Sequence, residues 1–228
     1  MVPDLNQLVS VVGTREKPVR NLRFYGLGFT GVAPGSDAIF FEYAHYCELV
    51  DGRLSAMDGQ AVRLGPGSFQ VRVLGNHITN IQGSAITVAG HAHPEHWMDI
   101  VRENILSYNY IDGAGGHCIG ALNCLNTTIS HNEVTTNPGR TAIYLGNWSS
   151  LEESINAGYR LEYNHVHHVQ ALADDSGAIT TAGFTHDSII RNNLIHHVKA
   201  GYFNNNVAIW FDNMSLNWVA RDNIMYAL

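Results

Sequence analysis

The sequence predicts an all-β fold, a right-handed parallel β-helix of about seven to eight coils that forms one domain over residues 1–228. Three observations predict it. An asparagine recurs in a series of short strand-like segments, a small residue followed by an aliphatic one recurs seven times, and there is almost no helical periodicity. Two other repeat folds are excluded. The sequence lacks the fixed leucine spacing of leucine-rich repeats, and it lacks the amphipathic stretches of about 10 to 15 residues that helical repeats need.

The asparagine repeat is a short alternating strand followed by Asn, any residue and an aliphatic residue, as in Val73-Leu74-Gly75-Asn76-His77-Ile78. Its members lie 23 to 33 residues apart and are Asn76, Asn109, Asn132, Asn164, Asn193 and Asn223. Asparagine tolerates the left-handed conformation at a bend and has a side chain that can hydrogen-bond to a neighbouring coil. We therefore expect these residues to be structural, without a chemical role.

The second repeat is a small residue followed by an aliphatic one, at intervals of 23 to 36 residues. Its members are Ala38-Ile39, Ala61-Val62, Ala85-Ile86, Cys118-Ile119, Ala142-Ile143, Ala178-Ile179 and Ala208-Ile209. In a parallel β-helix each coil stacks on the next at about 4.8 Å, so these pairs are expected to form interior columns.

Composition excludes several classes of function. With 13 Lys+Arg against 20 Asp+Glu, the net charge is −7, and no basic stripe is present to track nucleic-acid phosphates. No apolar run approaches the roughly 18 residues of a membrane span. Cys47, Cys118 and Cys124 are too few for a disulfide scaffold and are expected to be buried thiols.

Both ends of the chain resemble the middle of a solenoid, and Met1-Val2-Pro3 has no signal-peptide pattern. We expect a piece of a longer protein, truncated at both ends, whose full-length parent is secreted to the extracellular or periplasmic space. An uncapped solenoid end exposes strand edges, so a homo-oligomer through these ends is a further expectation.

The outward face of the second repeat suits a carbohydrate. Period-two alternation places Tyr144 and Trp210 on that face, where flat aromatic rings could serve as sugar platforms. Loops that interrupt the coils carry His91 and Trp148, and Arg140 could contact an acidic sugar. We interpret Trp210, Tyr144, Trp148, Arg140, Asp174 and His91 as substrate-binding candidates.

Glycosidic cleavage requires two carboxyl groups roughly 5 to 10 Å apart, and Asp175 and Asp212 are the candidates. Asp175 precedes Gly177-Ala178-Ile179, and Asp212 ends Ile209-Trp210-Phe211 in the next coil. Two alternatives stay open. Aspartate near glycine in a turn is ordinary turn chemistry, and straight-strand geometry would separate the two residues by about 23 Å.

The sequence supports a metal site less strongly than it supports a carbohydrate site. The run His91-Ala92-His93-Pro94-Glu95-His96 lacks predicted secondary structure to fix ligand geometry, so we expect loop histidines and no metal ligands. His167-His168 and His196-His197 occupy matching positions in adjacent coils and are expected to form a surface stack. No cofactor is expected, except Ca²⁺ if oxygens of Asp174, Asp175, Asp212 and Asn213 converge.

The stretches Leu172–Ile179, Ile190–Val198 and Ala208–Asn213 resemble carbohydrate-active right-handed β-helix proteins, and the nearest family is glycoside hydrolase family 141. Ala142–Trp148 is similar to a Gly-Ile-Ser-Val-Gly-x-x-Trp element of that family. The resemblance implies α-fucosidase or xylanase activity and a catalytic pair at Asp175 and Asp212. The sequence departs from the family in Thr180 and Trp210, where tyrosine is common, and in lacking the family's outer coils.

The leading hypothesis is a glycoside hydrolase acting on a polysaccharide or oligosaccharide. One alternative is a polysaccharide lyase that pairs Ca²⁺ with a basic residue, for which Arg63, Arg140 or Lys199 would have to serve. The other is a non-catalytic, tailspike-like β-helix that binds carbohydrate or acts as a spacer.

Overall fold

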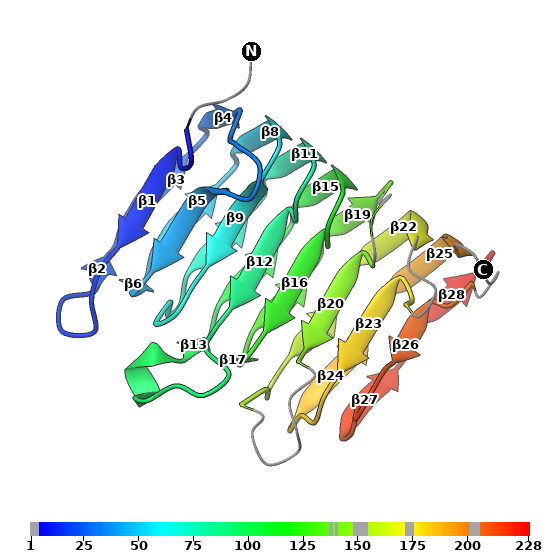
Figure 1. Ribbon diagram of the computed structural model, residues 1–228. Helices are drawn as coiled ribbons and strands as arrows, with labels where there is room; N and C mark the ends of the chain where they lie inside the picture. Colours follow the sequence, from blue (N-terminus) through cyan, green and yellow to red (C-terminus); the bar gives the residue numbers. More distant parts are fainter. Residues whose placement is uncertain (1–4, 137–138, 140, 148–154, 172–175, 201–205) are drawn as a thin grey trace.

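The computed structural model describes residues 5–136, 139, 141–147, 155–171, 176–200 and 206–228. Within them the chain winds as a parallel β-helix whose coils stack in chain order, from the blue N-terminal end to the red C-terminal end in Figure 1. Three parallel sheets of eight strands each form its faces, which confirms the predicted fold and coil number. No helix among the described residues is long and apolar enough to cross a membrane.

Sheet I carries the small-aliphatic repeat. Its strands are β1 (Val9–Val12), β5 (Asp37–Glu42), β9 (Gln60–Leu64), β12 (Ile86–Ala89), β16 (Ile119–Leu122), β20 (Ile143–Gly146), β23 (Ile179–Ala182) and β26 (Ile209–Phe211).

Sheet II consists of the strands that come before the asparagine position in each coil. Its strands are β3 (Arg23–Tyr25), β7 (Glu48–Val50), β10 (Arg72–Leu74), β14 (Ile105–Ser107), β18 (Thr128–Ser130), β21 (Arg160–Glu162), β24 (Ser188–Arg191) and β27 (Trp218–Arg221).

Sheet III follows the asparagines. Its strands are β4 (Gly28–Thr30), β8 (Arg53–Met57), β11 (His77–Ile81), β15 (Tyr110–Ala114), β19 (Glu133–Thr135), β22 (His165–Ala171), β25 (Leu194–Ala200) and β28 (Ile224–Tyr226). Short pairs form between β2 (Val19–Arg20) and β6 (Ala44–His45), and between β13 (Val101–Arg102) and β17 (Cys124–Leu125).

The interior columns are in the predicted register. The aliphatic member of each pair lies beside its equivalent in the next coil, in the order Ile39, Val62, Ile86, Ile119, Ile143, Ile179 and Ile209. The small residues, from Ala38 to Ala208, are all buried. Stacking identical side-chain shapes at the strand spacing fills the core with few voids, and burial of each such side chain contributes about 1.5–3 kcal/mol.

The six repeated asparagines form a hydrogen-bonded ladder that is buried except at its last member, Asn223. Asn132 is typical: its Oδ1 accepts from the backbone N–H and from Nδ2 of Asn109, at 3.0 and 2.9 Å. Its own Nδ2 donates to the Leu106 carbonyl and to Asn164 Oδ1, at 3.0 and 2.9 Å. The predicted bonding between coils is therefore confirmed.

The prediction that these asparagines adopt the left-handed conformation is wrong. The left-handed residue is the one before each asparagine, as at Tyr108, His131 and Tyr163, with φ of 61°, 56° and 58°. A left-handed residue turns the chain, and the following extended residue can then point its amide into the core. The left-handed side chains point outward, where the ring of His131 stacks on those of Tyr108 and Tyr163 at centroid distances of 4.8 and 5.2 Å.

Replacing Asn132 by alanine is expected to lower the free energy of unfolding by about 3 kcal/mol, because buried partners in both neighbouring coils lose their hydrogen bonds. Urea denaturation followed by circular dichroism measures this. The control is Asn6→Ala, because Asn6 is exposed and accepts one long contact of 3.5 Å from Ser36. Equal effects of the two substitutions would contradict a stabilising role for the ladder.

The three cysteines are buried and unpaired, as predicted. Burial raises the pKa of the Cys118 thiol to about 12 and that of Cys124 to about 11. A thiol held protonated and shielded reacts slowly. We expect no reaction of Cys118 or Cys124 with Ellman's reagent at pH 8 in the native protein, and three reactive thiols per chain in denaturant. Rapid native labelling of more than one thiol would contradict this.

Candidate functional site

The outward face of sheet I carries a column of side chains in the predicted register. Tyr144 on β20 lies beside Thr180 on β23, which lies beside Trp210 on β26. Two strand spacings separate Tyr144 from Trp210, or about 10 Å. Both rings are partly exposed, while Thr180 between them is buried. The fold thus brings two of the predicted substrate-binding aromatics to one face.

Close packing beneath Trp210 fixes its position. A Cβ on Gly177 would come within 3.2 Å of the Trp210 Cβ, so glycine allows the indole to approach the backbone of the preceding coil. The Thr180 hydroxyl accepts from the Gly177 N–H at 3.0 Å and lies 3.3 Å from the Thr141 hydroxyl. The Trp210 Nε1 atom is covered and has no hydrogen-bond partner among the described residues. The absence of a side chain at Gly177 therefore leaves the room that Trp210 occupies in the next coil.

Tyr144 has a partner that the sequence did not reveal. The imidazole of His117 stacks on the Tyr144 ring at a centroid distance of 5.1 Å and an interplanar angle of 18°. His117 precedes the small residue Cys118 of the repeat. The place of His117 in the repeat can be read from the sequence, but its stacking on Tyr144 depends on which coils are neighbours.

Asp212 directly follows β26, two residues after Trp210. Its Oδ1 accepts from the Asn213 N–H at 2.7 Å, and its own N–H donates to the Thr181 carbonyl at 2.9 Å. The Ser215 N–H donates to the Asp212 carbonyl at 3.0 Å, which closes a turn. The carboxylate is partly exposed, and its local contacts are those of a turn residue.

Four predicted site residues lie outside the described residues: Asp174, Asp175, Trp148 and Arg140. The catalytic pair of Asp175 and Asp212 therefore stays a prediction.

His91 lies in the loop after β12 and lines a pocket of about 210 Å³ with Arg15, Tyr43, His93, Glu95 and Asp99. Four strand spacings of sheet I separate β12 from β26, or about 19 Å. The structure consequently places His91 away from Trp210 rather than beside it.

The loop of His91 leads into a short helix that the sequence did not predict. A 3₁₀ helix, η1 (Trp97–Asp99), closes it, and His96 caps that helix by accepting from the Met98 N–H at 3.2 Å. The run His91–His96 itself contains no helix or strand, as expected, and the 3₁₀ helix begins directly after it.

Asp99 anchors the loop to the first coils. Arg15 donates two hydrogen bonds to its carboxylate, at 2.9 and 2.7 Å, and the Tyr43 hydroxyl donates a third at 2.8 Å. Burial by itself would raise the pKa of Asp99, but the hydrogen bonds from Arg15 and Tyr43 keep it below the ordinary value. This network could not be predicted from the sequence, because Arg15 and Asp99 are 84 residues apart.

No family model matches the sequence. No curated protein matches it either. Among solved structures, a protein described as a glycoside hydrolase superimposes with a TM-score of 0.79 at 15% identity, over 98% of this chain and 50% of that one. A family 136 lacto-N-biosidase from Eubacterium ramulus aligns at 10% identity, over 100% of this chain and 61% of that one. Its TM-score of 0.39 is too low to show a shared fold.

The first similarity establishes the fold, a β-helix shared with a chain described as a glycoside hydrolase. The chain spans about half the length of that protein, so what the whole protein does is not carried over by the superposition.

Substituting Asp99 by asparagine is expected to lower the free energy of unfolding at pH 7 by about 2 kcal/mol, because Arg15 loses a charged acceptor. A carboxyl with a lowered folded pKa stabilises the protein above its unfolded pKa near 4, and this contribution disappears as the pH falls through the folded pKa. Wild-type protein should therefore lose more stability below pH 4 than Asp99→Asn.

Thermal unfolding between pH 2.5 and pH 7 tests this. The matched control is Asp58→Asn, because Asp58 is exposed and its substitution should change stability by less than about 0.5 kcal/mol. The same pH profile in wild type and Asp99→Asn would refute the role of the network.

Proposed function

We propose that this β-helix is a polysaccharide-active protein, and that its activity is glycoside hydrolysis at the outward face of sheet I. The observation that carries the proposal is the in-register column of Tyr144, Thr180 and Trp210 with Asp212 at its edge. Two aromatic side chains about 10 Å apart on one face could contact two sugar units of the same oligosaccharide, and the partly exposed Asp212 follows Trp210 by two residues.

The comparisons support the proposal at a coarse level. The superposition with a protein described as a glycoside hydrolase supports this fold as a scaffold for such chemistry. The resemblance to glycoside hydrolase family 141 proposes the finer assignment, in which Asp175 and Asp212 are the acid and the base or nucleophile. Their separation decides between retention and inversion of configuration.

The second candidate function is carbohydrate binding without turnover. It is favoured by the contacts of Asp212, whose Oδ1 already accepts a hydrogen bond from its own turn. In that case Tyr144 and Trp210 would bind the sugar, and neither aspartate would take part in chemistry.

Assay of the full chain on aryl α-fucosides and xylo-oligosaccharides tests the hydrolase. If Asp175 and Asp212 act as proposed, Asp175→Asn and Asp212→Asn should each lower kcat at least about 100-fold, because acid–base groups contribute about 10² to 10⁴. The matched control is Asp187→Asn, an exposed left-handed position beyond β23 where asparagine fits, and it should keep full activity.

Binding by the same proteins separates the two candidates. The Trp210→Ala variant should lose oligosaccharide affinity under either function. Turnover that survives both aspartate substitutions would refute the proposed pair, whereas sugar binding without wild-type turnover would favour the binding protein.

A further inference from the structure

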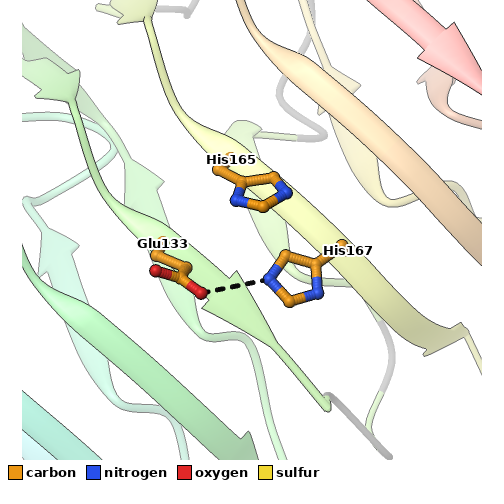
Figure 2. A group of neighbouring side chains, drawn as sticks. All are labelled: Glu133, His165 and His167. Carbon is orange, nitrogen blue, oxygen red and sulfur yellow. Dashed lines mark hydrogen bonds and ion pairs between the residues drawn. The ribbon is translucent and has the colours of Figure 1, made fainter.

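A cluster of histidines lies on the outward face of sheet III, away from the column of Tyr144 and Trp210. It consists of His165, His167 and His168 on β22 and His196 and His197 on β25, with Glu133 on β19 beside them. The strand register places Glu133 beside His165 and places His167 beside His196. Figure 2 shows Glu133, His165 and His167 with their polar ends converging on one space between the two strands.

The positions of the ligand atoms fit a metal ion. One oxygen of Glu133 and one nitrogen from each of His165 and His167 all lie within 4.8 Å of one another. Glu133 Oε1 and His167 Nε2 are 3.3 Å apart. Two ligands bound tetrahedrally to Zn²⁺ at about 2.0–2.1 Å lie about 3.4 Å apart, so this edge already has the required length.

Outer imidazoles already orient both histidines. His167 Nδ1 lies 2.8 Å from His168 Nδ1 and 3.3 Å from the Thr135 hydroxyl, which leaves its Nε2 facing Glu133. His165 Nε2 lies 2.8 Å from His196 Nε2. Metal-binding histidines usually hold their second ring nitrogen in this way, because the outer hydrogen bond fixes the tautomer and the ring orientation.

The stacking of the rings makes the cluster rigid. His167 and His196 are parallel at 5.2 Å, and His196 continues onto Tyr226 at 4.7 Å. His168 and His197 form a second parallel pair at 4.8 Å. These contacts confirm the surface stack expected from the sequence. The stack also fixes the donors before a ligand arrives, which lowers the entropic cost of binding.

We propose that Glu133, His165 and His167 bind one divalent transition-metal ion of the Zn²⁺ class. Two imidazoles and a carboxylate are the donor set of such ions, whereas Ca²⁺ and Mg²⁺ take oxygen ligands. Three protein ligands leave a coordination position for water or a ligand atom. The proposal is independent of glycoside hydrolysis, because it concerns a different face and its test measures binding.

Isothermal titration of the chelator-treated full chain with ZnCl₂ at pH 7.5 tests the site. We expect one ion per chain with micromolar or tighter affinity, weakened at least about tenfold in Glu133→Gln, His165→Gln and His167→Gln. The matched control is His77→Gln. His77 is on the same face of sheet III, on β11, three strand spacings or about 14 Å from β22, and its ring stacks on Tyr110.

Cobalt gives a second readout. Co²⁺ bound by these ligands should give visible d–d absorption bands that disappear in His167→Gln and persist in His77→Gln. Glu133 is exposed, so Glu133→Gln keeps the test valid if a histidine variant fails to fold, which circular dichroism would show. The absence of wild-type binding would overturn the proposal. So would binding that survives all three substitutions and is lost in His91→Gln or His93→Gln.

Discussion

The buried asparagine ladder is the constraint on which the rest of the structure depends. Each of the first five asparagines accepts from the coil before it and donates to the coil after it, so one coil cannot shift by a residue without breaking bonds on two sides. Such a shift would also turn every inward side chain outward. The ladder and the aliphatic columns therefore enforce a single register along the whole solenoid.

A fixed register has consequences on the outside of the molecule. Residues that share a position in successive coils must lie about 4.8 Å apart, whether or not their side chains attract one another. On sheet III this brings His77 and Tyr110 together in one place and His167 and His196 together in another. Side chains of one chemical kind become a surface array because the interior repeat places them there.

The same constraint explains how a structure can be shared at 15% identity. Most coils here repeat a small residue, an aliphatic residue, and an asparagine preceded by a residue in the left-handed conformation, whereas Gly52 takes the place of the asparagine in an earlier coil. The remaining outward positions are free to vary. Superposition of the coils consequently says little about the chemistry of the faces, which resides in residues such as Trp210, Asp212 and Glu133.

The sequence by itself determined the coil. The spacing of Ala38-Ile39 and its six equivalents, and of the asparagines, predicted the parallel β-helix and the residues of its core, because a repeated pattern can be buried only by stacking on itself. Alternation also predicted that Tyr144 and Trp210 share a face. The sequence did not predict which residue of the bend is left-handed, because both the asparagine and the residue before it were compatible with that conformation.

Only the tertiary structure decided which distant side chains meet. The intervals between repeats vary, so the contacts of Arg15 with Asp99 and of His165 with His196 depend on loop paths and coil register together. A long-range contact of this kind leaves no periodic trace in the sequence, since its partners belong to different positions of different coils. Local pattern determines the strand, and the stacking of coils determines the site.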